Sequence, residues 1–325
     1  MKKFIQLFSL LLLSNFALAQ DPFFSQYSVS TMTLNPALVG SHMQAENKFS
    51  FISRNQWWGS GAQSYLTNSM SYEGHVLSNL TNKFNHLSLG LMMLNENSNG
   101  GVLNNNYFSA ALSNQTQITE KIVLKLAISG TYSNRMLNLS NSTFQSQFGS
   151  FGFMNTASNY DPVAATSPSY IEMNTGFAME YSSSYIDYEW GGAIFHASKP
   201  KLGFYDNTKY EIDPRGVAHG ALTIRPNKNG AFIFSGNWQV QAQKQLFTIG
   251  GGYTFNVGDS ANHQLSIGIC DRINESIYPF ASLKVNSFVI GLSYDVTTAK
   301  NKTSFSSLNS SEASIVWEFG KQKKK

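Results

Sequence analysis

Residues 122–132 read IVLKLAISGTY, and this stretch decides the fold. Ile122, Leu126 and Ile128 fall on one face of an extended chain and Lys125 and Ser129 on the other, because successive side chains of a strand point in opposite directions. The same alternation recurs along the chain in segments of about ten residues, the length that a tilted strand needs to cross a bilayer. The polar faces are rich in Ser, Thr, Asn and Gly, which suit a water-filled lumen. The pattern therefore predicts an all-β protein, a transmembrane antiparallel β-barrel.

Counting the alternating segments gives about 14 strands, and 12 is the other count that the pattern allows. The predicted strand cores lie near 46–56, 63–73, 85–95, 105–116, 121–133, 170–181, 185–196, 216–226, 230–241, 244–256, 263–272, 276–284, 286–296 and 311–319. An even count places both termini on the periplasmic side. The longest connections, 134–169, 197–215 and 297–310, then become long extracellular loops, while most of the others become short periplasmic turns, as in outer-membrane barrels.

Composition and the first residues agree with this interpretation. Only 13% of the 325 residues are charged and 14% are aromatic, and no apolar run of about 18 residues follows residue 19, which excludes a helical membrane protein. Lys2, Lys3, the apolar run 4–16 and the Ala-Leu-Ala at 17–19 form a signal peptide with cleavage near Ala19. The expected layout is a signal peptide at 1–19, a periplasmic or lumenal segment at 20–45, the outer-membrane barrel at 46–320 and a basic periplasmic tail at 321–325. The expected location is the outer membrane of a Gram-negative bacterium.

No constellation indicates an enzyme, a metal site, a cofactor or nucleic-acid binding. Cys270 is the only cysteine, the six histidines show no ligand spacing, and the glycines at 250–252 lie in a strand pattern that no helix follows. His196 and Ser198 share a strand face, as the base and nucleophile of a barrel lipase would, but nothing is placed to orient the histidine. Seven charged residues are expected to point inward, where they either line a conducting pore or pair across the lumen and around a plug: Lys125, Glu172, Glu180, Asp187, Glu189, Asp295 and Glu318.

The loop 134–169 contains four spaced phenylalanines, Phe144, Phe148, Phe151 and Phe153. Loops of this length are usually functional or disordered, and aromatic residues are enriched in partner surfaces. The loop is thus either a flexible surface loop or a partner-binding one.

Three motifs near the N-terminus carry a family resemblance: QDPFFSQY at 20–27, LNPALVG at 34–40 and RNQW at 54–57. In this order and spacing they resemble the N-terminal signature of the PorP/SprF family of Bacteroidota outer-membrane proteins. The matching positions, to which the family assigns no role, are Asp21, Pro22, Phe24, Ser25, Gln26, Tyr27, Asn35, Pro36, Gly40, Arg54, Asn55, Gln56 and Trp57. The C-terminal KQKKK departs from the terminal aromatic residue of many barrels.

The resemblance implies a role with the type IX secretion and gliding motility machinery. Family members associate with periplasmic ring components of that system, or help to export a cargo or adhesin and hold it at the cell surface. We therefore expect a non-enzymatic secretion component that contacts ring components, cargo and outer-membrane lipid. The alternative, which rests on the polar inward face, is a general diffusion channel or solute transporter.

Overall fold

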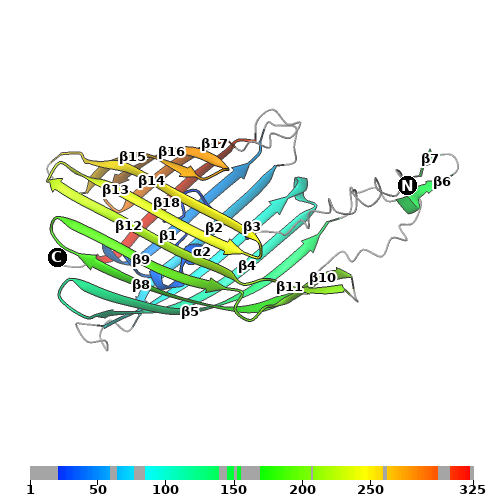
Figure 1. The fold of residues 1–325 in the computed structure, drawn as a ribbon, viewed down its shortest axis with the longest axis horizontal. Coiled ribbons are helices and arrows are strands. Elements are labelled where there is room, and N and C mark those ends of the chain that lie inside the picture. The colour runs from blue at the N-terminus through cyan, green and yellow to red at the C-terminus, as the bar shows by residue number, and fades with distance from the viewer. Residues whose placement is uncertain are drawn as a thin grey trace, which may run out of the picture.

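The computed structural model describes residues 21–58, 64–76, 85–138, 145–149, 152–154, 169–205, 208–258, 262–298 and 308–322. Fourteen antiparallel strands form a closed barrel (Figure 1), which confirms the predicted fold class. The barrel strands are β1 (Ala45–Gln56), β2 (Tyr65–Val76), β3 (Asn85–Ser98), β4 (Leu103–Gln117), β5 (Ile122–Leu137), β8 (Tyr170–Ser182), β9 (Ile186–Phe195), β12 (Arg215–Asn227), β13 (Gly230–Gln241), β14 (Lys244–Asn256), β15 (His263–Arg272), β16 (Ser276–Val285), β17 (Phe288–Thr297) and β18 (Ser310–Gln322).

The barrel closes because its first strand pairs with its last. β1 pairs with β2 on one side and with β18 on the other, where Arg54 lies opposite Glu312 and Phe51 opposite Ile315. Every other strand pairs with its neighbours in sequence, except that β5 lies beside β8 and β9 lies beside β12. Closure removes the unpaired strand edges that a bilayer does not tolerate.

Two of the three predicted long loops contain short elements that the sequence pattern did not reveal. The strands β6 (Phe148–Gly149) and β7 (Gly152–Phe153) pair within 134–169, and β10 (Lys201–Tyr205) pairs with β11 (Thr208–Glu211) within 197–215. Short 3-10 turns occur at η2 (Asn99–Gly101) and η3 (Gln145–Gln147). The β10–β11 pair lies at the end of the barrel that carries the long connections, which is the extracellular end (Figure 1).

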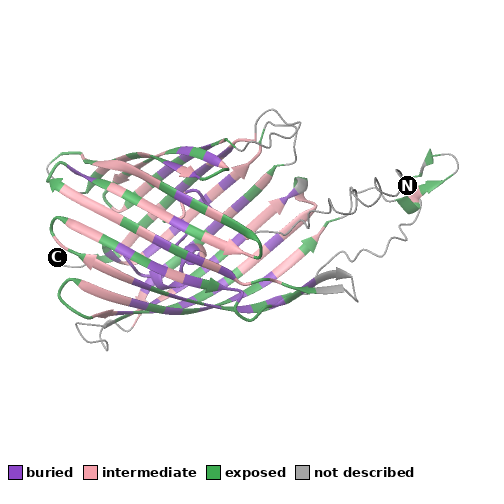
Figure 2. Cartoon of the chain, in the orientation of Figure 1, coloured by how far each residue is buried: buried purple, intermediate pink, exposed green. Residues whose placement is uncertain are grey.

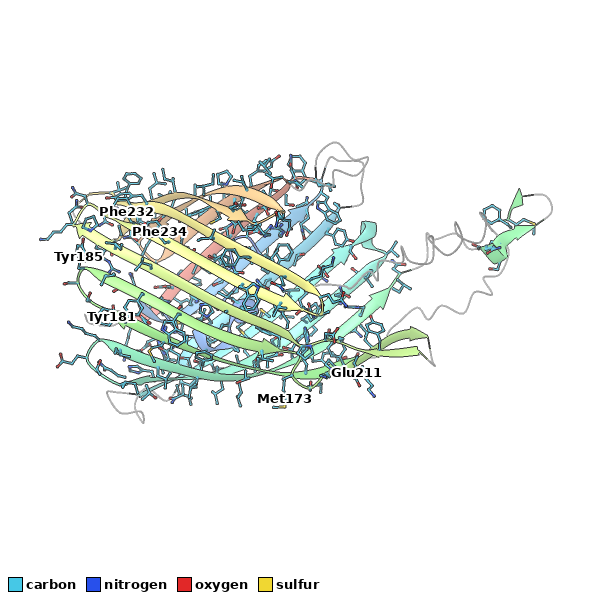
Figure 3. All side chains as sticks on the ribbon, in the orientation of Figure 1. Met173, Tyr181, Tyr185, Glu211, Phe232 and Phe234 are labelled. Carbon is cyan, nitrogen blue, oxygen red and sulfur yellow. The ribbon has the colours of Figure 1, made fainter. Side chains whose placement is uncertain are left out.

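The outer surface of the barrel is apolar and the inner surface is polar. Large hydrophobic side chains are exposed along the alternating outward positions, including Met173, Phe232 and Phe234, which project from the wall in Figure 3. The inward positions carry buried serines, threonines and paired charges. Buried and exposed residues alternate along strands such as β4 and β5, and bands of the two classes are visible on the wall in Figure 2. No helix among the described residues is long and apolar enough to cross a membrane.

Residues 21–44, hereafter the N-terminal segment, lie inside the barrel. The segment contains the helical turn α2 (Thr31–Leu34) and the 3-10 turn η1 (Pro36–Leu38), and η1 packs against β4, β5 and β8 (Figure 1). Its apolar side chains form two buried clusters with the wall. One cluster contains Leu34, Ala37, Leu38, Ala127, Ala178, Ala193, Phe195 and Val217, and the other contains Phe24, Met32, Val39, Ile52, Met92, Leu94 and Ala111.

Candidate functional site: the occupied lumen

Two arginines and two acidic residues from four strands surround Ser25 of the N-terminal segment. Ser25 Oγ accepts hydrogen bonds from Arg54 Nη1 (2.5 Å) and Arg272 Nη2 (2.7 Å) and donates to Asp295 (2.8 Å). Arg54 also pairs with Glu312, and both arginines lie 2.9 Å from Asp295. None of the five residues is more than 4% exposed. Buried charges are costly unless they are paired, so the two positive and two negative side chains require one another.

Gln26 and Tyr27 extend this attachment to neighbouring strands. Ser314 Oγ donates to Gln26 Oε1 at 2.7 Å, and Gln26 Nε2 donates to Ser293 at 3.4 Å. The Tyr27 hydroxyl donates to Ser235 Oγ at 2.7 Å. The motif around residue 25 is thus a contact surface for β13, β17 and β18.

A second charged cluster holds Asp21 in the extracellular half of the barrel. Asp21 accepts from His196 Nε2 (2.6 Å) and pairs with Arg215 Nε (2.9 Å), while His196 Nδ1 faces Glu172. Burial alone would lower the pKa of His196, but Asp21 and Glu172 more than offset this effect and raise the pKa to about 9. Burial would likewise raise the pKa of Asp21, but His196 and Arg215 hold it well below its usual range. The cluster is therefore an ion pair at neutral pH.

Asn35 and Pro36 form the start of η1 and fit it against the wall. Asn35 Oδ1 accepts from the Ala37 amide at 2.9 Å, so the asparagine caps the turn, and Pro36 occupies the first position, where no amide donor is needed. Asn35 Nδ2 also reaches the Phe177 carbonyl at 2.9 Å and the His219 ring at the same distance. The Asn-Pro motif thus shapes the turn and attaches it to β8 and β12.

Glu73 of β2 holds the segment at two points. It accepts from Thr31 Oγ1 at 2.7 Å and from the Gly40 amide at 2.8 Å, and Lys48 balances its charge at 2.8 Å. Gly40 has φ +74°, and an added Cβ would lie 2.1 Å from Ser88 Oγ. Only glycine combines this backbone conformation with so close an approach to the wall.

At the periplasmic end, His42 meets a third charged cluster. Its Nε2 lies 3.0 Å from Glu189 and its Nδ1 lies 3.8 Å from Glu180. These residues offer three metal-ligand atoms within 4.8 Å of one another. Lys125 Nζ, however, lies 2.6 Å from Glu180 and 2.5 Å from Glu189, so an ammonium group already supplies positive charge between the carboxylates. Beyond it, the Gln44 amide donates to Glu318 at 2.9 Å.

The structure gathers most of the motif residues into this one site. Asp21, Phe24, Ser25, Gln26, Tyr27, Asn35, Pro36 and Gly40 lie in the N-terminal segment, Pro22 lines a small cavity of about 50 Å³ beside Asp21, and Arg54 extends from β1 to meet Ser25. Asn55, Gln56 and Trp57 lie apart, at the extracellular end of β1. There the Trp57 amide donates to the Asn309 carbonyl at 2.8 Å, and its ring packs edge-on against Tyr65 at 4.9 Å.

All seven charged residues that were expected to point inward have partners. Lys125, Glu172, Glu180, Glu189 and Asp295 pair as described, Glu318 accepts from the Gln44 amide, and Asp187 pairs with Arg225 near the β8–β9 turn. Of the two alternatives left open by the sequence, the structure favours pairing, with partners on nearby strands and on the N-terminal segment. The sequence interpretation missed Glu73, Arg215, Arg272 and Glu312. Glu73, Arg272 and Glu312 are charges on the polar face of an alternating segment, the same signal that identified Asp295. Arg215 was assigned to the predicted loop 197–215, whereas the structure begins β12 at this residue.

The structure gives no support to the His196–Ser198 lipase pair, which the sequence did not favour either. Both ring nitrogens of His196 face carboxylates, and Ser198 Oγ instead accepts from the Met173 amide at 3.4 Å. A histidine held in this way is not placed as a base for Ser198.

Of the four loop phenylalanines, only Phe148 has a described side chain, which is 61% exposed. Phe153 pairs with Phe148 through the β6–β7 backbone. Phe144 and Phe151 lie outside the described residues, so the proposed partner-binding role of this loop stays a prediction.

Fold and site together define an outer-membrane β-barrel whose lumen is occupied by its own N-terminal segment. The chain belongs to the PorP/SprF family, because the model of the type IX secretion system membrane protein PorP/SprF matches residues 17–317. No curated protein sequence matches the chain.

Solved structures share the fold at low sequence identity. The TodX ΔS2S3 mutant monoaromatic hydrocarbon channel is 10% identical, with 90% of this chain and 93% of that chain covered and a TM-score of 0.50. The CymD monoaromatic hydrocarbon channel is 11% identical with the same coverage and TM-score. The Ralstonia pickettii toluene transporter TbuX is 11% identical, covers 90% and 94%, and has a TM-score of 0.49. At such identities the likeness concerns the fold alone.

Proposed function

We propose that this chain is a non-enzymatic component of type IX secretion that assists the export or surface attachment of a cargo or adhesin. The observation that carries the proposal is the family membership, taken together with the occupied lumen. Three charged clusters and two apolar clusters fill the interior with the N-terminal segment, so the loops and the two rims are the surfaces left for partners. Ring components of the secretion system would meet the periplasmic rim, and cargo would meet the extracellular loops. Export through residues 1–19 as a signal peptide is part of the same proposal.

Deletion of the gene, with complementation by the intact gene, tests this role. If the protein serves export, the deletion strain retains cargo in the periplasm; if it serves attachment, the cargo appears in the culture medium instead of on the cell. Unchanged cargo display and unchanged type IX secretion, in a strain without a second family member, would contradict the proposal. Amino-terminal sequencing of the mature protein checks the leader, and we expect it to begin at Gln20.

The alternative is a channel or transporter. It is favoured by the polar inward face and by the fold shared with barrels that are described as channels. Swelling of proteoliposomes in iso-osmotic sugar solutions separates the two functions, because a diffusion channel admits the sugar and an occupied barrel does not.

A further inference from the structure

The N-terminal segment is not part of the barrel sheet. Among the described residues, the main-chain hydrogen bonds of 21–44 to other main-chain groups close short turns within the segment, such as Val29 to Gln26, Asn35 to Thr31 and Ser41 to Leu38. Strand pairing with the wall begins only at Ala45. The segment is therefore held as a ligand is held, by side chains that reach it from the wall.

The wall recognises the backbone at Ser25 and Gln26. The two oxygens of Glu312 accept from consecutive amides, Oε1 from Ser25 at 2.5 Å and Oε2 from Gln26 at 2.8 Å. The Tyr278 hydroxyl donates to the Ser25 carbonyl at 3.3 Å. Because the Glu312 carboxylate accepts from two successive main-chain amides, this contact does not depend on which side chains the bound segment carries. Hydrogen bonds to a charged acceptor are also stronger than those between neutral groups.

The same wall also recognises side chains. Arg54 and Arg272 lie over the Phe23 ring, with their guanidinium carbons 5.0 Å and 4.6 Å from its centroid, a cation–π arrangement. Two residues later, Ser25 Oγ forms hydrogen bonds with both arginines and with Asp295. An aromatic residue followed, after one residue, by a serine is thus recognised together with the main-chain amides of residues 25 and 26.

We propose that the inner wall around Arg54, Arg272 and Glu312 is a peptide-binding site in its own right. Residues 21–27 occupy it as a tethered ligand, and a separate polypeptide with the pattern aromatic residue, any residue, serine can replace them. This inference goes beyond the secretion role, since it concerns binding and exchange in the purified protein.

An exchange experiment on the full chain tests the site. A protease recognition sequence is inserted after Gln44, which is exposed at the periplasmic mouth, and the folded protein is cut there so that the segment remains bound without its tether. A fluorescent synthetic peptide of residues 20–44 is then added, and its binding is followed by anisotropy. We expect saturable binding as the labelled peptide exchanges with the bound segment. The uncut protein, whose own segment stays tethered, binds the peptide at least about 10-fold more weakly.

Matched variants show whether recognition runs through the proposed contacts. A peptide with Phe23→Ala and Ser25→Ala should compete at least about 10-fold less well, because it loses a cation–π contact and a buried hydrogen-bond centre. The wall variant Glu312→Gln should weaken binding similarly, whereas Glu120→Gln in the exposed β4–β5 turn should not. Failure of the native peptide to exchange after cutting, or equal binding by the doubly substituted peptide, would overturn the proposal.

Discussion

Glu312 and Ser25 are 287 residues apart in sequence, yet a Glu312 oxygen accepts the Ser25 amide hydrogen at 2.5 Å. This contact joins the last barrel strand to the first part of the N-terminal segment. In the closed barrel, the pairing of β18 with β1 places Glu312 opposite Arg54, which also contacts Ser25. Binding of the segment therefore depends on the closed barrel. Substitutions at this contact should weaken the attachment of the segment more than the strand pairing of the barrel.

Replacing Arg54 with methionine should release the first part of the segment. The change leaves Asp295 and Glu312 buried with one arginine between them, and breaking a buried pair in this way costs about 3–5 kcal/mol. Proteolysis within residues 21–44 of the folded protein should accelerate on the order of 100-fold. Arg225→Met, which removes a half-exposed ion pair with Asp187 away from the segment, is the control, and equal proteolysis of both variants would contradict the account.

Replacing Gly40 with alanine should unseat the other end of the segment. The added Cβ would lie 2.1 Å from Ser88 Oγ, and the left-handed backbone at φ +74° adds a cost of about 1 kcal/mol or more. We expect faster hydrogen exchange of the amides at 38–41. Gly101→Ala is the matched control, since Gly101 also has positive φ, at +90°, but has open space around it. Equal hydrogen exchange in the two variants would contradict the account, in which the contact of Gly40 with Ser88 of β3 is what requires glycine.

Stability should fall as the pH rises through about 9. The folded pKa of His196, about 9, lies above its unfolded value of about 6.5, so its contribution is fully present below pH 6.5 and is lost as the pH passes 9. The free energy of unfolding in denaturant should decrease by up to about 3 kcal/mol over this interval. His196→Gln should remove this alkaline loss, and His263→Gln, at the exposed start of β15, should preserve it. An unchanged profile in His196→Gln would rule out the cluster with Asp21 and Glu172 as its source.

Replacing Phe148 with serine should affect partners and leave the barrel intact. Its side chain is 61% exposed in the β6–β7 hairpin, so little packing is lost. If the loop binds cargo, the variant should display less cargo on the cell while heat-modifiable migration of the barrel stays normal. Ile118→Ser, which changes a similarly exposed residue at a periplasmic turn, should leave display unchanged. Normal display by Phe148→Ser would argue against a role for this residue.

The barrel could be predicted from the sequence because strand alternation is a local signal. The predicted segment 244–256 coincides with β14, and 85–95 falls short of β3 only at its C-terminal end, where Asn95 and Asn97 replace the apolar residues of the outer face. The β10–β11 hairpin was missed because its 5 and 4 residues are too short to show a clear alternation.

The site was harder to predict because its contacts are not local. The motifs marked Ser25 and Arg54, and alternation marked Asp295, but nothing in the sequence says that these three residues meet. Their proximity depends on the register of β1 with β18 and β17 with β18, and on the path of a segment that has no periodicity of its own. Arg272 and Glu312 carried the same inward-charge signal as Asp295, and a stricter count of isolated charges on polar faces would have found them.

Conductance of the purified full-length protein in planar bilayers tests the central claim, that the N-terminal segment occupies the lumen, most directly. The account predicts a silent barrel for the native protein. It predicts intermittent current for a variant carrying Asp21→Asn, Ser25→Ala and His42→Ala, in which each of the three charged clusters has its side-chain contacts to the segment weakened or removed. A steady open current through the native protein would contradict the account.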